Sequence, residues 1–278
     1  MDSFSERLVA AVASTGPLCA GIDPSASLLT DWGLTDDAAG LRAFGSRCVE
    51  AFAGTVPVVK PQVAFFERHG AAGFGALEQL IAEARSAGLL VIADAKRGDI
   101  DSTMDAYADA WLGPDGPFQA DALTATPYLG LGTLRPLFDA ARANGRGVFV
   151  VVRSSNPEGR PLQEAATAGG PSVEDGLLAE LGRLNGSEAG ALGPFGAVVG
   201  ATLAPSAFPL SQLGGPILAP GVGTQGGGPA DVAALCTGCA PRSVLPSTSR
   251  SVLGAGPSTE ALRSAAARAR DDFAAALC

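Results

Sequence analysis

The sequence predicts a single-domain (β/α)₈ barrel, the TIM-barrel type of α/β fold, spanning residues 1–278. Eight short apolar runs alternate along the chain with eight Ala-rich helical stretches. The runs are nearly continuous in apolar residues, which is typical of parallel strands buried on both faces. The 278-residue length suits one such barrel, and no Pro/Ser-rich linker divides the chain.

Strands and helices are expected in strict alternation. The predicted strands are Pro17–Ile22, Val56–Pro61, Leu89–Ala95, Ala120–Thr126, Gly147–Arg153, Gly196–Thr202, Pro216–Pro220 and Ser243–Pro246. The predicted helices are Asp36–Ala53, Gly73–Ala87, Ser102–Leu112, Leu131–Ala143, Ser172–Leu184, Pro205–Leu213, Pro229–Cys239 and Ser258–Leu277. The mixed charge of the first residues indicates a further amphipathic helix and not a signal peptide. Eight strand–helix units favour a closed barrel over an open sheet.

The charge balance argues against two classes of partner. The chain carries 28 acidic and 19 basic residues, a net charge of −9, with no contiguous basic stretch. A nucleic-acid binder usually presents a basic face, because phosphate neutralisation supplies most of its non-specific affinity. No run of 18 or more apolar residues exists, so no transmembrane helix is expected. We therefore expect no nucleic acid and no membrane as partners, and any bound anion should be small.

The cysteines indicate a reducing compartment. Their odd number and irregular spacing in a long chain are typical of free thiols and not of a disulfide framework. They are Cys19, Cys48, Cys236, Cys239 and Cys278. The sequence therefore predicts a cytoplasmic protein.

Charged residues stand where the predicted strands end, and the strand ends of a barrel meet at one mouth. Asp23 follows the first strand, Lys60 ends the second, and Asp94-Ala95-Lys96-Arg97-Gly98-Asp99 ends the third. Residues i and i+2 of an extended strand point to the same side, so Asp94 and Lys96 should both face the mouth, within reach of Lys60. Alternating carboxylates and ammonium groups keep each other charged. An ammonium held in this way can stabilise a developing carbanion and then protonate it. The alternative is a ring of ion pairs whose only role is to hold the barrel closed.

The turn after the seventh strand is rich in glycine. Gly221-Val222-Gly223-Thr224-Gln225-Gly226 matches Gly-x-Gly-x-x-Gly, but the carboxylate that a dinucleotide site needs about 20 residues later is missing. Free backbone N–H groups in such a turn suit an anion, and barrels commonly bind phosphate after strands seven and eight. Gln225 and Arg250 could add an amide and a guanidinium. The long stretch Ser154–Pro171 after the fifth strand is expected to be a functional loop or a lid.

Taken together, these motifs resemble those of the orotidine 5′-phosphate decarboxylases. Asp94-Ala95-Lys96-Arg97-Gly98-Asp99 matches the family's Asp-x-Lys-x-x-Asp signature on the third strand. Other segments fall in the expected order along nearly the whole chain, among them Lys60-Pro61-Gln62, Pro127-Tyr128-Leu129-Gly130 and Ser154-Ser155-Asn156-Pro157. The long stretch Ser154–Pro171 after the fifth predicted strand is similar to the loop found in the longer bacterial branch of this family.

The resemblance implies a role for each site residue. It implies a charged tetrad of Lys60, Asp94, Lys96 and Asp99, with Lys96 protonating C6 of the pyrimidine and Asp94 against the departing carboxylate. Asp23, Lys60 and Thr103 would hold the ribose hydroxyls, Ser155 would contact the base, and Gln225 and Arg250 would grip the phosphate. The implied reaction converts orotidine 5′-monophosphate to uridine 5′-monophosphate and carbon dioxide, in pyrimidine biosynthesis, with no metal and no organic cofactor. The family also implies a homodimer in which Asp99 and Thr103 enter the partner's site.

Two other functions stay open at this point. A magnesium-dependent sugar-phosphate decarboxylase or aldolase of the same superfamily shares the Asp-x-Lys-x-x-Asp pattern, but it would want a metal-binding carboxylate at Lys60. A catalytically silent nucleotide-binding protein is the second, and the intact tetrad argues against it.

Overall fold

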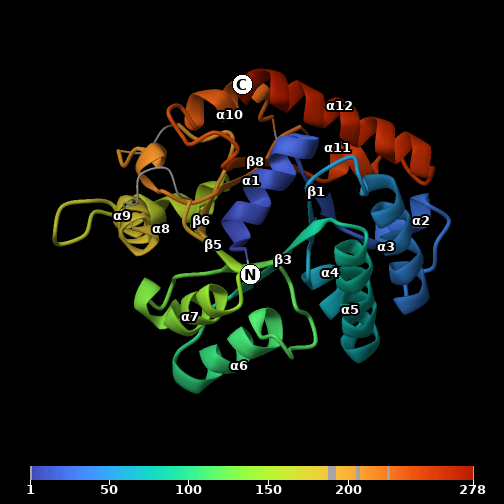
Figure 1. Cartoon of the computed structure of the whole chain (residues 1–278), viewed down its shortest axis with the longest axis horizontal. Helices are drawn as coiled ribbons and strands as arrows, with labels where there is room; N and C mark the ends of the chain where they lie inside the picture. Colours follow the sequence, from blue (N-terminus) through green and yellow to red (C-terminus); the bar gives the residue numbers. More distant parts are fainter. Residues whose placement is uncertain (1, 187–191, 205–206, 224–225, 278) are drawn as a thin grey trace.

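The computed structural model describes residues 2–277 except 187–191, 205–206 and 224–225. Its eight parallel strands close into a barrel in the order β1 to β8, as the sequence predicts (Figure 1). Parallel pairing of Cys19 with Ser247 joins the first strand to the last. The strands are β1 (Cys19–Ile22), β2 (Val58–Pro61), β3 (Leu90–Arg97), β4 (Ala122–Ala125), β5 (Gly147–Arg153), β6 (Phe195–Val199), β7 (Ile217–Pro220) and β8 (Val244–Thr248).

Helices surround the barrel (Figure 1). The longer ones are α1 (Phe4–Thr15), α3 (Ala38–Phe52), α5 (Gly70–Ser86), α6 (Asp101–Leu112), α7 (Arg135–Ala143), α9 (Val173–Asn185), α10 (Pro229–Leu235) and α12 (Thr259–Leu277). Short helical turns lie in the loops at α2 (Ala26–Asp31), α4 (Ala64–Glu67), η1 (Leu131–Leu134), η2 (Pro157–Gly159), α8 (Arg160–Gln163), η3 (Leu210–Gln212) and α11 (Arg250–Leu253). Within the described part of the chain, no helix has the length and apolar character that crossing a membrane requires.

The apolar core has two layers. One lies between the strands and the outer helices, and the other fills the barrel itself. In the inner layer, Phe4, Leu8 and Val12 of α1 pack against strand residues such as Phe149, so α1 closes the N-terminal end of the barrel. A capping box between Ser3 and Glu6 fixes the start of this helix.

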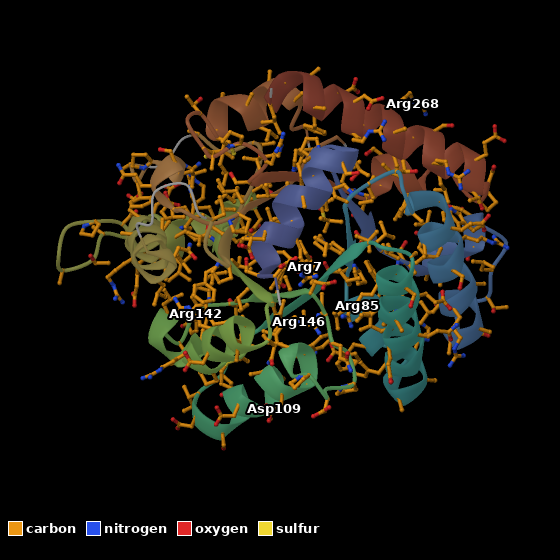
Figure 2. The ribbon with its side chains drawn as sticks, in the orientation of Figure 1. Arg7, Arg85, Asp109, Arg142, Arg146 and Arg268 are labelled. Atoms are coloured by element: carbon orange, nitrogen blue, oxygen red, sulfur yellow. The ribbon has the colours of Figure 1, made fainter. Side chains whose placement is uncertain are left out.

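A charged cluster fastens α1 to the barrel. The buried carboxylate of Asp121 accepts hydrogen bonds from Arg7 Nη1 at 2.6 Å, from Arg146 Nη1 at 3.3 Å and from the Val91 backbone N–H at 3.0 Å. Arg85 approaches the same carboxylate at 3.8 Å. Figure 2 shows these three arginines gathered beside α1. One carboxylate therefore joins α1, α5, β3 and the segment before β5 at the end of the barrel opposite the mouth.

The prediction of a sixth outer helix at Pro205–Leu213 is wrong. Residues 205–206 lie outside the described residues, and the rest of the segment contains only the three-residue turn η3. Pro209 explains the difference, because proline has no N–H to donate and disfavours the helical conformation of the residue before it. The predicted helix at Leu131–Ala143 is also divided, into η1 and α7.

Candidate active site

A cavity of about 320 Å³ opens at the C-terminal mouth of the barrel. All eight strands or the residues directly after them contribute to its lining, which places it where barrel enzymes carry their chemistry. Its polar lining residues are Asp23, Lys60, Gln62, Asp94, Lys96, Thr124, Arg153, Ser154, Ser155, Ser247, Thr248, Ser249 and Arg250.

Three of the predicted residues meet in a charged network at the floor of this cavity. The Nζ of Lys60 lies 2.7 Å from Oδ2 of Asp94, and the Nζ of Lys96 lies 2.6 Å from Oδ1. The Thr124 hydroxyl donates a third hydrogen bond to Asp94 at 2.9 Å. Lys60 is 6% and Asp94 is 7% exposed, whereas the Lys96 side chain is 48% exposed. Lys60 and Asp94 are therefore the buried members of the network, and Lys96 is its solvent-accessible member.

Mutual attraction keeps this network ionised. Burial alone would raise the pKa of Asp94, but Lys60 and Lys96 outweigh that effect and hold the pKa well below its usual range. Burial would likewise lower the pKa of Lys60, and the negative charges of Asp94 and Asp23 instead hold it above its usual range. Near neutral pH the network is therefore a carboxylate between two ammonium groups.

The backbone at Lys96 differs from the extended strand that the sequence predicts. Its φ is +49°, in the left-handed region that non-glycine residues rarely adopt, and the pairing of β3 with β4 shifts between Ala93 and Arg97. The Lys96 N–H donates to the Thr124 hydroxyl at 2.9 Å, and the same hydroxyl donates to Asp94. Asp94 and Lys96 thus meet as predicted, but through an irregularity of β3 held by Thr124 and not through simple strand alternation.

Several polar residues of the cavity were not predicted as site residues, and Thr124 and Arg153 are the two that make the strongest contacts. Thr124 interrupts an otherwise apolar strand, Ala-Leu-Thr-Ala, and that interruption was the available signal. Arg153 ends β5 but is only 6% exposed, and its Nε lies 2.7 Å from Oε2 of Glu174. Its partner Glu174 lies 21 residues away in the sequence, on α9, so no local sequence pattern indicates the pair.

Asp23 faces the same cavity. Its Oδ1 is buried and has no hydrogen-bond partner among the described residues. A buried carboxylate oxygen of this kind is a ready acceptor for a ligand hydroxyl, because unsatisfied buried polar groups are costly.

Asp99 and Thr103 do not join the cavity of their own chain. The Asp99 carboxylate accepts a hydrogen bond from the neighbouring Ile100 N–H at 2.8 Å, and Thr103 is exposed on α6. The large apolar side chain of Ile100, directly after Asp99 in the chain, is 49% exposed. The structure therefore brings together three members of the predicted tetrad and leaves the fourth on the outer surface.

Arg250 brings a positive charge to the side of the cavity next to the turn after β7. The prediction of free N–H groups in this turn does not hold for Gly223, Gly226 and Gly227, whose N–H groups donate to carbonyl oxygens within the turn. Gly221 and Gly223 adopt φ of +96° and +77°, which only glycine adopts without strain, and the Gly223 N–H donates to Gly227 O at 2.8 Å to close the turn. Arg250, the first residue of α11, lines the cavity beside this turn. Ser155 lines it from the end of β5. Gln225 lies outside the described residues.

The fold is that of a barrel enzyme, and its mouth carries a network of lysines and aspartates at the strand ends. Residues 16–265 match the model of the orotidine 5′-phosphate decarboxylase / HUMPS family, and the chain belongs to that family.

Its relatives agree with this assignment. The chain is 51% identical over 277 residues to an orotidine 5′-phosphate decarboxylase of Salinispora arenicola, covering 100% of this chain and 99% of the relative. It is 53% identical to the enzyme of that name from Streptomyces coelicolor, covering 96% of each chain. A crystal structure of a candidate orotidine 5′-phosphate decarboxylase from Streptomyces avermitilis superposes with a TM-score of 0.95 at 52% identity, covering 100% of this chain and 96% of that one.

Proposed function

We propose that the chain decarboxylates orotidine 5′-monophosphate to uridine 5′-monophosphate and carbon dioxide, the step that completes uridylate synthesis. The observation that carries this proposal is the buried Lys60–Asp94 pair with Lys96 extended from it into the cavity. The family match and the names of relatives at about half identity over the whole chain support the same reaction.

The chemistry falls on Lys96. When the bond between C6 and the carboxylate breaks, its electron pair stays on C6 and carbon dioxide leaves. The Lys96 ammonium stabilises that carbanion and then gives it a proton, which forms the C6–H bond of the product. Asp94 lies against the leaving carboxylate and fixes Lys96 at 2.6 Å. The reaction needs neither a metal nor an organic cofactor, since the fixed charges of the chain stabilise the carbanion.

The remaining lining residues bind the nucleotide. Asp23 and Lys60 hold the ribose hydroxyls, and the unpaired Oδ1 of Asp23 supplies the acceptor for one of them. Ser155 contacts the base from the end of β5. Arg250, which lines the cavity, grips the phosphate, and Gln225, assigned to the same phosphate from the sequence, lies outside the described residues.

The enzyme acts as a homodimer with shared sites. Asp99 and Thr103 lie outside their own cavity, so a partner that covers this surface would receive them in its site. The exposed side chain of Ile100, which lies between Asp99 and Thr103 in the sequence, suits such an interface.

The proposal extends to the whole chain as one decarboxylase domain in the cytosol. Cys19, Cys48, Cys236 and Cys239 are free thiols, which suits a reducing compartment.

Release of carbon dioxide from orotidine 5′-monophosphate, followed as the loss of orotate-ring absorbance in excess chelator, tests the proposal. Turnover that is unchanged by chelator supports it. Turnover restored only by magnesium, or activity on a sugar phosphate alone, would favour the metal-dependent members of the superfamily. Lys60 argues against them, because it stands where a metal-binding carboxylate would be wanted.

A further inference from the structure

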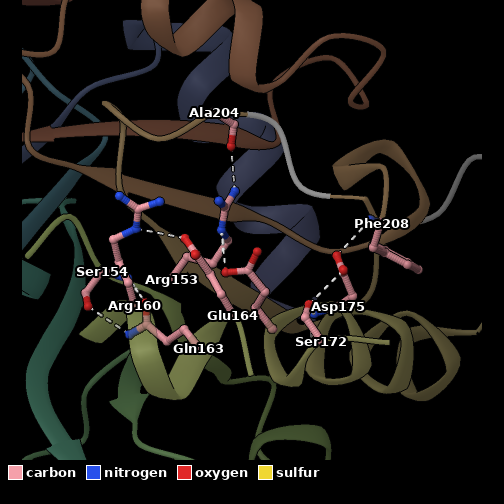
Figure 3. A network of polar contacts seen from close by, with 10 residues as sticks. Arg153, Ser154, Arg160, Gln163, Glu164, Ser172, Asp175, Ala204 and Phe208 are labelled. Atoms are coloured by element: carbon pink, nitrogen blue, oxygen red, sulfur yellow. Dashed lines mark hydrogen bonds and ion pairs between the residues drawn. The ribbon is translucent and has the colours of Figure 1, made fainter. Parts of the chain in front are cut away.

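The loop after β5 holds Ser154 with a single side chain. Gln163, in α8, accepts a hydrogen bond from the Ser154 backbone N–H through Oε1 at 3.1 Å. Its Nε2 donates to the Ser154 hydroxyl at 2.8 Å (Figure 3). One amide thus fixes both the backbone and the side chain of the residue directly before Ser155.

Gly159 leaves the space that this contact occupies. A Cβ added at Gly159 would lie 2.8 Å from Gln163 Nε2 and 2.8 Å from Ser154 Oγ, closer than carbon can approach either atom. The φ of Gly159 is −74°, which any residue adopts, so its backbone conformation does not require glycine. The requirement for glycine at this position therefore arises from the Gln163–Ser154 contact.

The residues on either side of Ser154 are fixed as well. Arg153 donates through Nη1 to Ala204 O at 2.7 Å (Figure 3). Its Nε also pairs with Glu174 Oε2. Ser155 packs against Gly200, where an added Cβ would lie 3.2 Å from the Ser155 backbone nitrogen. Gln163 is the contact through which the otherwise exposed loop completes this support.

We propose that Gln163 is a positioning residue for base recognition. Its amide holds Ser154 so that Ser155 presents its polar groups to the edge of the pyrimidine ring, although Gln163 itself does not line the cavity. This inference rests on the proposed function, because Ser155 is the group assigned to the base.

Two substitutions at Gln163 separate positioning from loop packing. Gln163→Leu removes both hydrogen bonds at similar volume, whereas Gln163→Glu keeps acceptors for the Ser154 N–H and hydroxyl. Misplacing a binding group by about 1 Å can cost up to about a hundred-fold in rate. We expect Gln163→Leu to lose roughly ten- to hundred-fold in kcat/KM for orotidine 5′-monophosphate, and Gln163→Glu to recover most of that loss. Gly159→Ala should behave like Gln163→Leu.

Inhibition constants of two product-like ligands supply the decisive readout. Uridine 5′-monophosphate carries the base, and ribose 5-phosphate lacks it. The positioning role requires Gln163→Leu to weaken only the first. Equal weakening of both, or no weakening of either, overturns the inference in favour of a packing role. Wild-type protein that binds uridine 5′-monophosphate without turning over orotidine 5′-monophosphate would instead contradict the proposed function, and the binding comparison would still test Gln163. If Gln163→Leu does not fold, Gly159→Ala, whose added Cβ would lie 2.8 Å from Gln163 Nε2 and so displace the amide, takes its place in the same comparison.

Discussion

Substituting the two lysines of the network one at a time should distinguish their contributions to turnover from their contributions to the free energy of unfolding. Lys96→Ala and Lys60→Ala should both abolish turnover, since in the proposed mechanism the first removes the proton donor and the second leaves Asp94 with one ammonium partner, Lys96. Their effects on folding should differ. After Lys96→Ala, Asp94 keeps Lys60 at 2.7 Å and Thr124 at 2.9 Å, and the lost ammonium was half exposed. The free energy of unfolding should fall by less than about 1 kcal/mol.

Lys60→Ala breaks a buried pair instead. Both partners are less than a tenth exposed, and removing one member of such a pair costs about 3–5 kcal/mol when the other charge is left unpaired. Lys96 still pairs with Asp94 at 2.6 Å, so this range is an upper limit. At about 2–4 °C per kcal/mol for a protein of this size, the Tm should fall by up to roughly 20 °C, and by more than after Lys96→Ala. Equilibrium urea unfolding followed by circular dichroism, beside the decarboxylation assay, measures both quantities. Equal destabilisation by the two substitutions, or near wild-type turnover of folded Lys96→Ala, would refute this division of roles.

Four further predictions follow from the site. Dialysis against a strong chelator should leave the rate unchanged, and a loss that magnesium restores would contradict the proposed chemistry. Orotidine without its phosphate should lose kcat as well as affinity, because remote binding energy can drive closure, and phosphite should partly rescue it; weaker binding with unchanged kcat would contradict closure. Mixing Lys96→Ala and Asp99→Ala subunits under exchange should restore about a quarter of wild-type activity, because about half of random dimers are mixed and each has one intact site; no recovery despite exchange would assign Asp99 to its own chain. The folded pKa of Asp94 is depressed, so its contribution to stability is full above about pH 4 and is lost as pH falls through the lower folded pKa. The difference in unfolding free energy between wild type and Asp94→Asn should therefore shrink below about pH 4, and a constant difference in urea titrations would contradict it.

The strand pattern predicts the barrel closely because burial on both faces leaves a strong local signal. The predicted fifth strand has the same bounds as β5, Gly147–Arg153. The failed helix at Pro205–Leu213 shows the limit of composition, since its apolar content outweighed the effect of Pro209 in the prediction. The contact between Asp94 and Lys96 was predicted from their order on one strand, although the strand alternation behind that prediction does not hold at Lys96.

Other parts of the site depend on contacts that no local pattern carries. The left-handed conformation of Lys96 is supported by Thr124, which comes from the neighbouring strand. Arg153 is neutralised by Glu174 on α9 and is bound by Ala204 beyond β6. Long-range support of this kind is set by tertiary packing, so it becomes visible only when the strands are assembled.

The helix that closes the N-terminal end of the barrel also determines how small molecules reach the reacting carbon. Phe4, Leu8 and Val12 fill the interior together with Phe149, and Phe4 and Leu8 are fully buried. Water therefore reaches the Lys96 ammonium through the same mouth that admits the nucleotide, and carbon dioxide leaves through it. When the nucleotide fills that mouth it shields the carbanion from bulk solvent, so the proton on C6 should come from Lys96 and retain the isotope that the ammonium carried.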